Sequence, residues 1–367
     1  MRLADELERR RLNDTFAALR GLPERSGSQE AVALRVRREL TDLGFAVEGD
    51  PLGPVPVSLL CRLPGPAAEL PAAVPAGAPG APDAGSGPRA VTAVAPTVVL
   101  GARLDADAAL LLAVAHRARM EPLPCGVELL FTVGDDVQGP ELLADLDAAR
   151  LTSAYGFFFD HAGPFGELVT ASPTTYRLEV DFHRRPDAYR EDEGGAAVRA
   201  AARTVLVGVH GRPPGDPVVT MEEVLEADAP GTDPARGSVR LLATVRSLDE
   251  AAAEQTVADL VDRCYDAGNE PESACDVDVV VTRLAGGLRH GPGQPAVRVA
   301  EAALRRCGHE PRRVTGDRST DADRLTAAGV WCVRLARGSR GGAGTGSPDE
   351  LDELLDLVLT LLDEAAA

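Results

Sequence analysis

The sequence lacks two features that would assign it at once to a common class. None of its six cysteines forms a C-x-x-C pair, which argues against a zinc-binding or redox motif of that type. No apolar run approaches the roughly 18 residues needed to span a bilayer, and the first residues contain no apolar signal-peptide segment. We therefore expect a cytoplasmic protein without a membrane partner, whose scattered cysteines are buried thiols in a reducing compartment.

Positive charge is also scarce. The chain has 38 Lys and Arg residues against 57 Asp and Glu residues, a formal net charge of −19. A negative mean field repels phosphate backbones, so we expect no nucleic-acid partner.

Length and composition indicate a folded protein of two domains. The chain has 367 residues, of which 44% are hydrophobic and 26% are charged. Single hydrophobic cores stop growing at roughly 250 residues, which favours two cores here. Residues 63–96 are a Pro/Ala/Gly run without periodicity, and we expect a flexible surface loop there.

Short apolar strands alternate with helical segments in both outer parts of the chain, after two helices expected before residue 45. This alternation of strands and helices predicts a largely parallel sheet covered by helices. We expect it to form an α/β catalytic-type domain made of residues 1–172 and 286–367. The last helix should begin at Ser347, which is followed by Pro and Glu in favourable capping positions. The expected strands are 97–101, 127–133, 155–160 and 330–336, and the expected helices are 107–118, 140–148 and 294–307.

The middle of the chain has a different pattern. Between residues 173 and 285, apolar and polar residues alternate in the first and last segments, as expected for strands with one wet face. A helix is expected near 194–208, a strand at 238–246, and a second helix where Ser247 and Glu250 have capping-box spacing. The order of elements predicts an inserted ferredoxin-like α+β domain.

Polar side chains follow three of the expected parallel strands. In an open parallel sheet, ligand-binding groups gather at the carboxyl ends of strands, so these side chains should meet at one edge. Any single Asp in such a turn can also simply cap a helix or bind its own backbone. The residues are Arg103 and Asp105 after the first strand, Asp135 and Asp136 after the second, and Asp160 and His161 after the third.

Several phrases along the chain resemble the zinc-dependent exopeptidase and deacylase family that includes peptidase T and acetylornithine deacetylase. The most specific is FTVGDDVQG at 131–139; others are PTVVLGARLDAD, YGFFFDHAGPFGELV and STDADRLTAAGVWCVRLARG. The resemblance implies a phosphorylase/hydrolase-like domain of the zinc-peptidase type. It also implies two zinc ions that share an Asp, a His on each ion, and a Glu-Glu pair that supplies a general base and a ligand.

The residues of this chain depart from that pattern at several positions. Arg103 stands where the family has a His, and a guanidinium cannot coordinate zinc. Asp135 occupies the position of the general base, with a side chain one methylene shorter than Glu. The loop before the last helix contains no His. Asp107, Asp136 and Asp160 match the family's carboxylate ligands.

We therefore expect no intact zinc site and no bound cofactor or, at most, a divalent metal ion. Without imidazole ligands the remaining carboxylates would suit Mg²⁺, Ca²⁺ or Mn²⁺ better than Zn²⁺. Arg103 could replace the metal by pairing with Asp107, Asp136 or Asp160. His161 is either a ligand or a polar turn residue.

Three functions stay open at this point. The first is a divergent, non-catalytic binding or regulatory protein, with a small peptide or acyl-amino-acid ligand. The second is an active metal-dependent hydrolase of peptide or N-acyl amide bonds with a rearranged, carboxylate-rich site. The third is a non-hydrolytic enzyme in which Arg103 clamps a substrate carboxylate or phosphate. The resemblance also implies a homodimer formed through the inserted domain.

Overall fold

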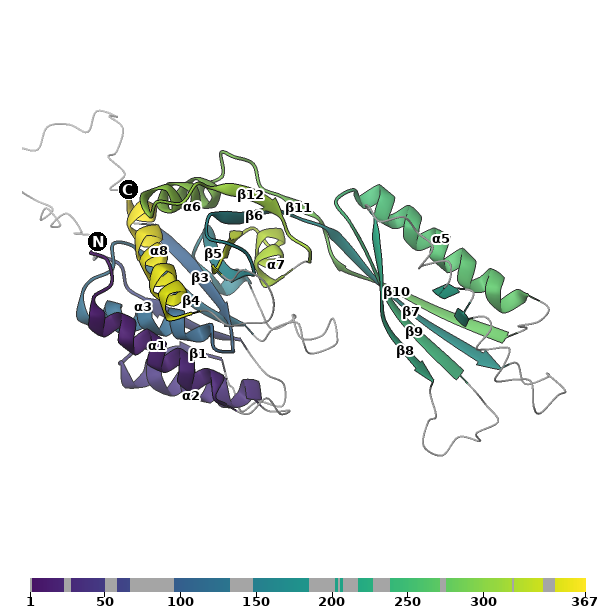
Figure 1. Cartoon of the computed structure of the whole chain (residues 1–367), viewed down its shortest axis with the longest axis horizontal. Helices are drawn as coiled ribbons and strands as arrows, with labels where there is room; N and C mark the ends of the chain where they lie inside the picture. The colour runs from purple at the N-terminus through teal and green to yellow at the C-terminus, as the bar shows by residue number, and fades with distance from the viewer. Residues whose placement is uncertain are drawn as a thin grey trace, which may run out of the picture. The chain divides into compact units, whose positions relative to one another are not determined.

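The chain divides into two compact units in its computed structural model (Figure 1). The first unit contains Met1–Leu168, Pro292–Arg313 and Ala328–Ala367, and the second contains Val169–Gly291 and Val314–Ala327. The structure describes residues 2–22, 28–49, 58–66, 96–132, 148–184, 202–203, 205–206, 217–226, 238–270, 275–318, 320–338 and 347–367.

Two predicted helices fall mainly outside these residues. The helix expected at 140–148 is not described apart from its last residue, which opens a short 3₁₀ turn, η2 (Ala148–Arg150). Of the helix expected near 194–208, only residues 202–203 and 205–206 are described, and these are helical.

The described residues of the chain form a mixed sheet of nine strands, in the order β1-β2-β4-β3-β5-β13-β6-β11 with β12 paired to β6. The neighbours β4, β3, β5 and β13 are parallel, whereas β1, β2 and β11 pair antiparallel with their neighbours. The predicted largely parallel α/β sheet is therefore confirmed. The strands are β1 (Val47–Glu48), β2 (Leu59–Leu63), β3 (Thr97–Arg103), β4 (Gly126–Thr132), β5 (Tyr155–His161), β6 (Glu167–Ser172), β11 (Leu288–Arg289), β12 (Arg312–Thr315) and β13 (Trp331–Ala336).

The helices of the first unit share one hydrophobic core with this sheet. Helix α8 contacts α1, α3 and α6, and its Leu-rich sequence is buried along most of its length. It begins with the predicted capping box between Ser347 and Glu350. The helices are α1 (Glu6–Arg20), α2 (Ser28–Asp42), α3 (Ala108–Met120), α6 (Pro295–Arg306) and α8 (Pro348–Ala366).

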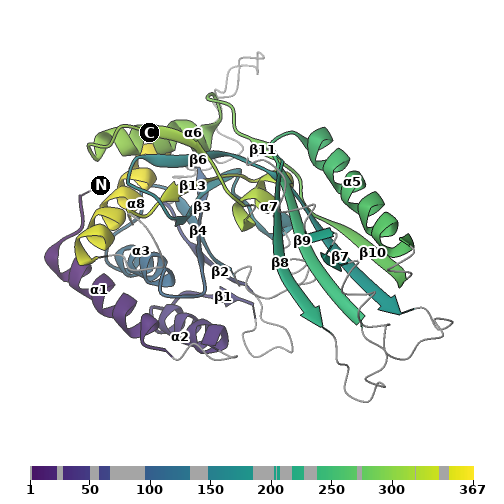
Figure 2. The same ribbon diagram turned by 45° about the vertical axis from the view of Figure 1, so that its right-hand side comes forward.

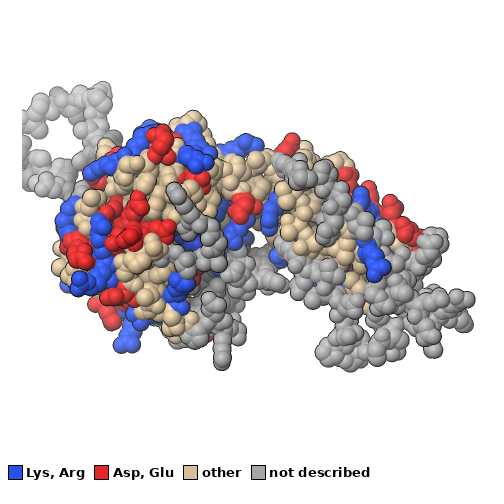
Figure 3. All heavy atoms as spheres, viewed as in Figure 1, with Lys and Arg blue, Asp and Glu red and all other residues tan. Residues whose placement is uncertain are grey.

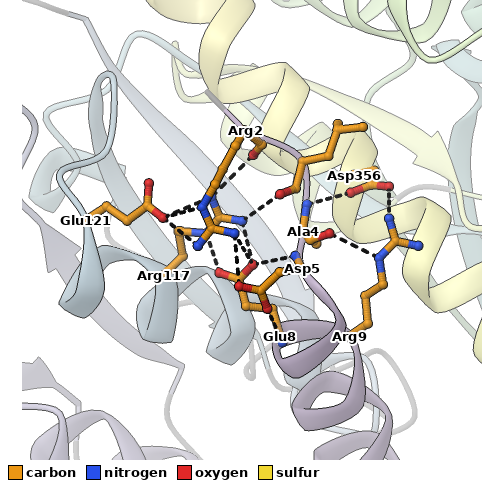
Figure 4. A network of polar contacts seen from close by, with 9 residues as sticks. Arg2, Ala4, Asp5, Glu8, Arg9, Arg117, Glu121 and Asp356 are labelled. Atoms are coloured by element: carbon orange, nitrogen blue, oxygen red, sulfur yellow. Dashed lines mark hydrogen bonds and ion pairs between the residues drawn. The ribbon is translucent and has the colours of Figure 1, made fainter.

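Two buried charged side chains of the first unit, Arg117 and Glu128, each fix a neighbouring segment of the chain in place. Arg117 of α3 is only 2% exposed, and its guanidinium donates to the Glu8 carboxylate and to the backbone oxygens of Arg2 and Leu3 (Figure 4). Because a buried guanidinium must be paired, this side chain fixes the start of the chain against α3.

Glu128 of β4 is the second such group, with a side chain 1% exposed. It accepts hydrogen bonds from the backbone N–H groups and hydroxyls of Thr152 and Ser153 and from Arg62 Nε. Burial by itself raises the pKa of Glu128, but these donors outweigh it and leave the pKa below its usual value. Glu128 thereby fixes the turn that leads into β5.

Surface charges of both signs are interspersed on the viewed face of the first unit (Figure 3). Some of them pair between helices: Nη1 of Arg306 in α6 lies 2.6 Å from an oxygen of Asp363 and 3.0 Å from an oxygen of Glu364, both in α8. Exposed pairs of this kind contribute little to stability.

The second unit contains a four-stranded antiparallel sheet in the order β10-β7-β9-β8. Alternate apolar residues of its strands pack beneath a helix, α5, that lies along one face of the sheet (Figures 1 and 2). The predicted alternation is confirmed. The elements are β7 (Thr174–Arg184), β8 (Val218–Glu226), β9 (Ser238–Ser247), α5 (Glu250–Asn269) and β10 (Cys275–Ala285), and the unit also contains α7 (Asp321–Ala327).

The start of α5 differs from the prediction. The N-cap is Asp249, whose carboxylate accepts from the N–H groups of Ala251 and Ala252, while the Ser247 hydroxyl accepts from the N–H of Asp249. Asp and Ser are comparable caps, and here the Asp nearest the first helical residue takes the position.

None of the helices described in the structure is long and apolar enough to cross a membrane.

Candidate functional site

The candidate site lies at the carboxyl ends of β3, β5 and β13, all within the first unit. These three strands are parallel neighbours, and Ala336 at the end of β13 pairs with His161 at the end of β5. Their ends therefore meet at one edge of the sheet, where parallel α/β proteins place functional groups. This edge brings together Asp105, Asp107 and Asp160.

Asp105 and Asp107 occupy the short connection between β3 and α3. Asp105 Oδ1 accepts a hydrogen bond of 2.8 Å from the backbone N–H of Asp107, so this carboxylate closes the turn. Asp107 precedes the first residue of α3 but makes no side-chain cap, which leaves its carboxylate available for other partners.

Asp107 has an unusual electrostatic environment. The pKa of Asp107 is raised to about 7, first by burial, then by the neighbouring charge of Asp105 and to a smaller extent by that of Asp160. The cations of Arg337 and Arg103 act in the opposite direction but do not outweigh burial. The pKa of Asp107 therefore reflects its burial first and the charges around it second.

Each of the three carboxylates lies beside an arginine. Arg337 Nη1 donates to Asp107 Oδ2, and Arg334 Nε donates to Asp160 Oδ1 at 2.7 Å. The second pair is buried, with side chains 3% and 9% exposed. Arg103 Nε lies 3.6 Å from Asp105 Oδ2.

The arginines that pair with Asp107 and Asp160 were not anticipated. The sequence predicts Arg103 beside Asp107, Asp136 or Asp160. Arg334 and Arg337 instead come from β13 and from the residue that follows it. One signal was present in the sequence: Arg334 lies inside an otherwise apolar strand, and a buried arginine needs a partner.

His161 is held within its own turn. Its Nε2 lies 3.2 Å from Glu167 Oε2, and both side chains are mostly buried. Gly163 makes this contact possible, because a Cβ there would lie 2.5 Å from the Glu167 oxygen and 2.9 Å from His161 Nε2. The arrangement favours the polar-turn interpretation of His161 over a role as a ligand.

The described residues do not fit the two zinc ions that the family resemblance implies. Among them, no three His, Cys, Asp or Glu side chains lie close enough together to hold a metal ion. Asp107 and Asp160, which the resemblance implies as ligands, are each paired with a guanidinium that repels a divalent cation. Asp135 and Asp136, expected as general base and ligand, lie outside the residues that the structure describes.

Comparisons with known proteins identify the fold. No family model matches the sequence. The uncharacterized protein YqjE of Bacillus subtilis (strain 168) is 24% identical over 276 residues, covering 74% of this chain and 73% of YqjE.

Solved structures of peptidases superimpose on nearly the whole chain. Aminopeptidase PepT of Bacillus cereus has a TM-score of 0.69 at 20% identity, covering 98% of this chain and 99% of its own. A tripeptidase of Staphylococcus aureus has a TM-score of 0.71 at 16% identity and covers 98% of both chains. This chain has the fold of these peptidases.

The peptidase fold extends to metal-binding relatives and confirms the predicted likeness to the peptidase T family at the level of fold. Bacillus subtilis YxeP, described as a dinuclear metal-binding peptidase from the M20 family, has a TM-score of 0.63 at 13% identity and covers 98% of this chain and 99% of its own. The chain thus combines the fold of these peptidases with carboxylates that are paired to arginines.

Proposed function

We propose that this peptidase-like chain binds a small peptide or an N-acyl amino acid as a non-catalytic binding or regulatory protein, without the two-zinc chemistry. The observation that carries the proposal is the pairing of Asp107 with Arg337 and of Asp160 with Arg334. These two carboxylates match family metal ligands, and both already have a cation.

The chemistry of arginine explains why a guanidinium in place of a metal ion would abolish hydrolysis. A metal ion polarises a carbonyl oxygen and lowers the pKa of bound water, which generates the nucleophile at neutral pH. A guanidinium neutralises a carboxylate but offers no open coordination position for water. Arg103 at a family His position and the absence of His between residues 337 and 350 support the same conclusion independently.

Metal content, binding and turnover of the purified full-length protein test the proposal together. We expect less than 0.1 zinc per chain by elemental analysis, and no cleavage of a panel of di- and tripeptides and N-acyl amino acids with or without added zinc. We expect at least one panel member to bind by calorimetry. One or two zinc ions per chain together with cleavage would overturn the proposal, and binding of no panel member would reject the ligand class.

A second candidate function is a hydrolase with a rearranged, carboxylate-rich site. The raised pKa of Asp107, about 7, favours it, because a group with a pKa near the working pH is suited to proton transfer. If the panel reveals turnover that Asp107→Asn reduces at least 100-fold, this second function is the correct one.

The homodimer expected through residues 173–285 stays a prediction. Light scattering coupled to size exclusion checks it, and a mass of one chain at micromolar concentration would reject it.

A further inference from the structure

We draw no further inference here: the strongest candidate, the outer edge of strand β10 in the second unit with its exposed Val280 and Val281, carries none, because nothing in the described part of the chain shows what covers it.

Discussion

Replacing Arg334 by methionine removes the guanidinium that faces Asp160, in the most buried ion pair of the candidate site that the structure describes. The Nε–Oδ1 distance is 2.7 Å, and the two side chains are 3% and 9% exposed. The variant leaves the mostly buried Asp160 carboxylate without the guanidinium that donates to it. Breaking a buried pair from one side in this way typically costs about 3–5 kcal/mol of unfolding free energy.

A double-mutant cycle separates the pair from the packing around it. Asp160→Asn should also cost about 3 kcal/mol, because the buried guanidinium of Arg334 then loses the carboxylate to which its Nε donates. The double variant leaves no charge behind, so its loss should be far smaller than the sum, with a coupling energy of about 3 kcal/mol or more. The exposed pair Arg306–Glu364 is the control, with an expected coupling of about 0.2–1 kcal/mol.

Trp331 provides the assay. It is the only tryptophan of the chain, it is 40% exposed, and it begins the strand that carries Arg334. Its emission during urea titration therefore reports the unfolding of the first unit, where both pairs lie. Titrations with and without EDTA show whether a metal ion contributes to the charge balance around Asp160.

The reasoning would be refuted by single variants that each lose less than about 1 kcal/mol, or whose losses add within about 0.5 kcal/mol. A second contradicting result would be a loss of unfolding free energy in Arg334→Met that appears only after EDTA treatment. In that case a metal ion, and not Arg334, balances Asp160 in the untreated protein.

Three further predictions concern charged side chains that are buried or mostly buried in the first unit. Glu128→Gln should cost about 2–3 kcal/mol at pH 7. Because the folded-state pKa of Glu128 is lowered, the difference should shrink as pH falls through that pKa in acid unfolding titrations, and a loss independent of pH would contradict it. The pKa of Asp107 is raised, so the folded state binds more protons between about pH 4 and pH 7. The difference in unfolding free energy between the wild type and Asp107→Asn should therefore favour the wild type more at pH 5 than at pH 8, by on the order of 2 kcal/mol. Equal differences at the two pH values would reject the raised pKa. Arg117→Met should cost about 3 kcal/mol and expose the segment before α1 to limited proteolysis, whereas an unchanged cleavage rate would show that Glu8 and Arg117 do not anchor it.

The elements with strong local signals were predictable from the sequence. Continuous apolar runs identified β3, β4, β5 and β13, and the Ser-Pro-Asp-Glu start identified α8. Short strands such as β1, β11 and β12 carry no such signal, since they exist only because a neighbouring strand offers hydrogen bonds. The cap of α5 was also mispredicted, because Ser247 and Asp249, two positions apart, are comparable caps and the local sequence does not decide between them.

The aspartates of the candidate site were predictable from the sequence, but the arginines that pair with them were not. Asp105, Asp107 and Asp160 follow strands whose parallel order brings their ends together, so their convergence could be inferred. Their counter-ions could not, because Arg334 and Arg337 lie about 170 to 230 positions away and reach the edge only through the pairing of β13 with β5. The partner of a buried charge is a tertiary property that neighbouring residues do not encode.

In the proposed function, the residue types at this edge follow from the kind of cation that it holds. The sequence contains no lysine, so every basic side chain other than histidine is an arginine, which stays charged at any physiological pH and donates in a fixed fork. An aspartate is useful beside a guanidinium or a metal ion, since both need a negative oxygen partner. A neutral imidazole coordinates a metal ion through a lone pair, but it brings no negative charge to balance a guanidinium. Aspartates retained at positions 107 and 160, with Arg103 in place of a histidine, are therefore what an edge compensated by arginine requires.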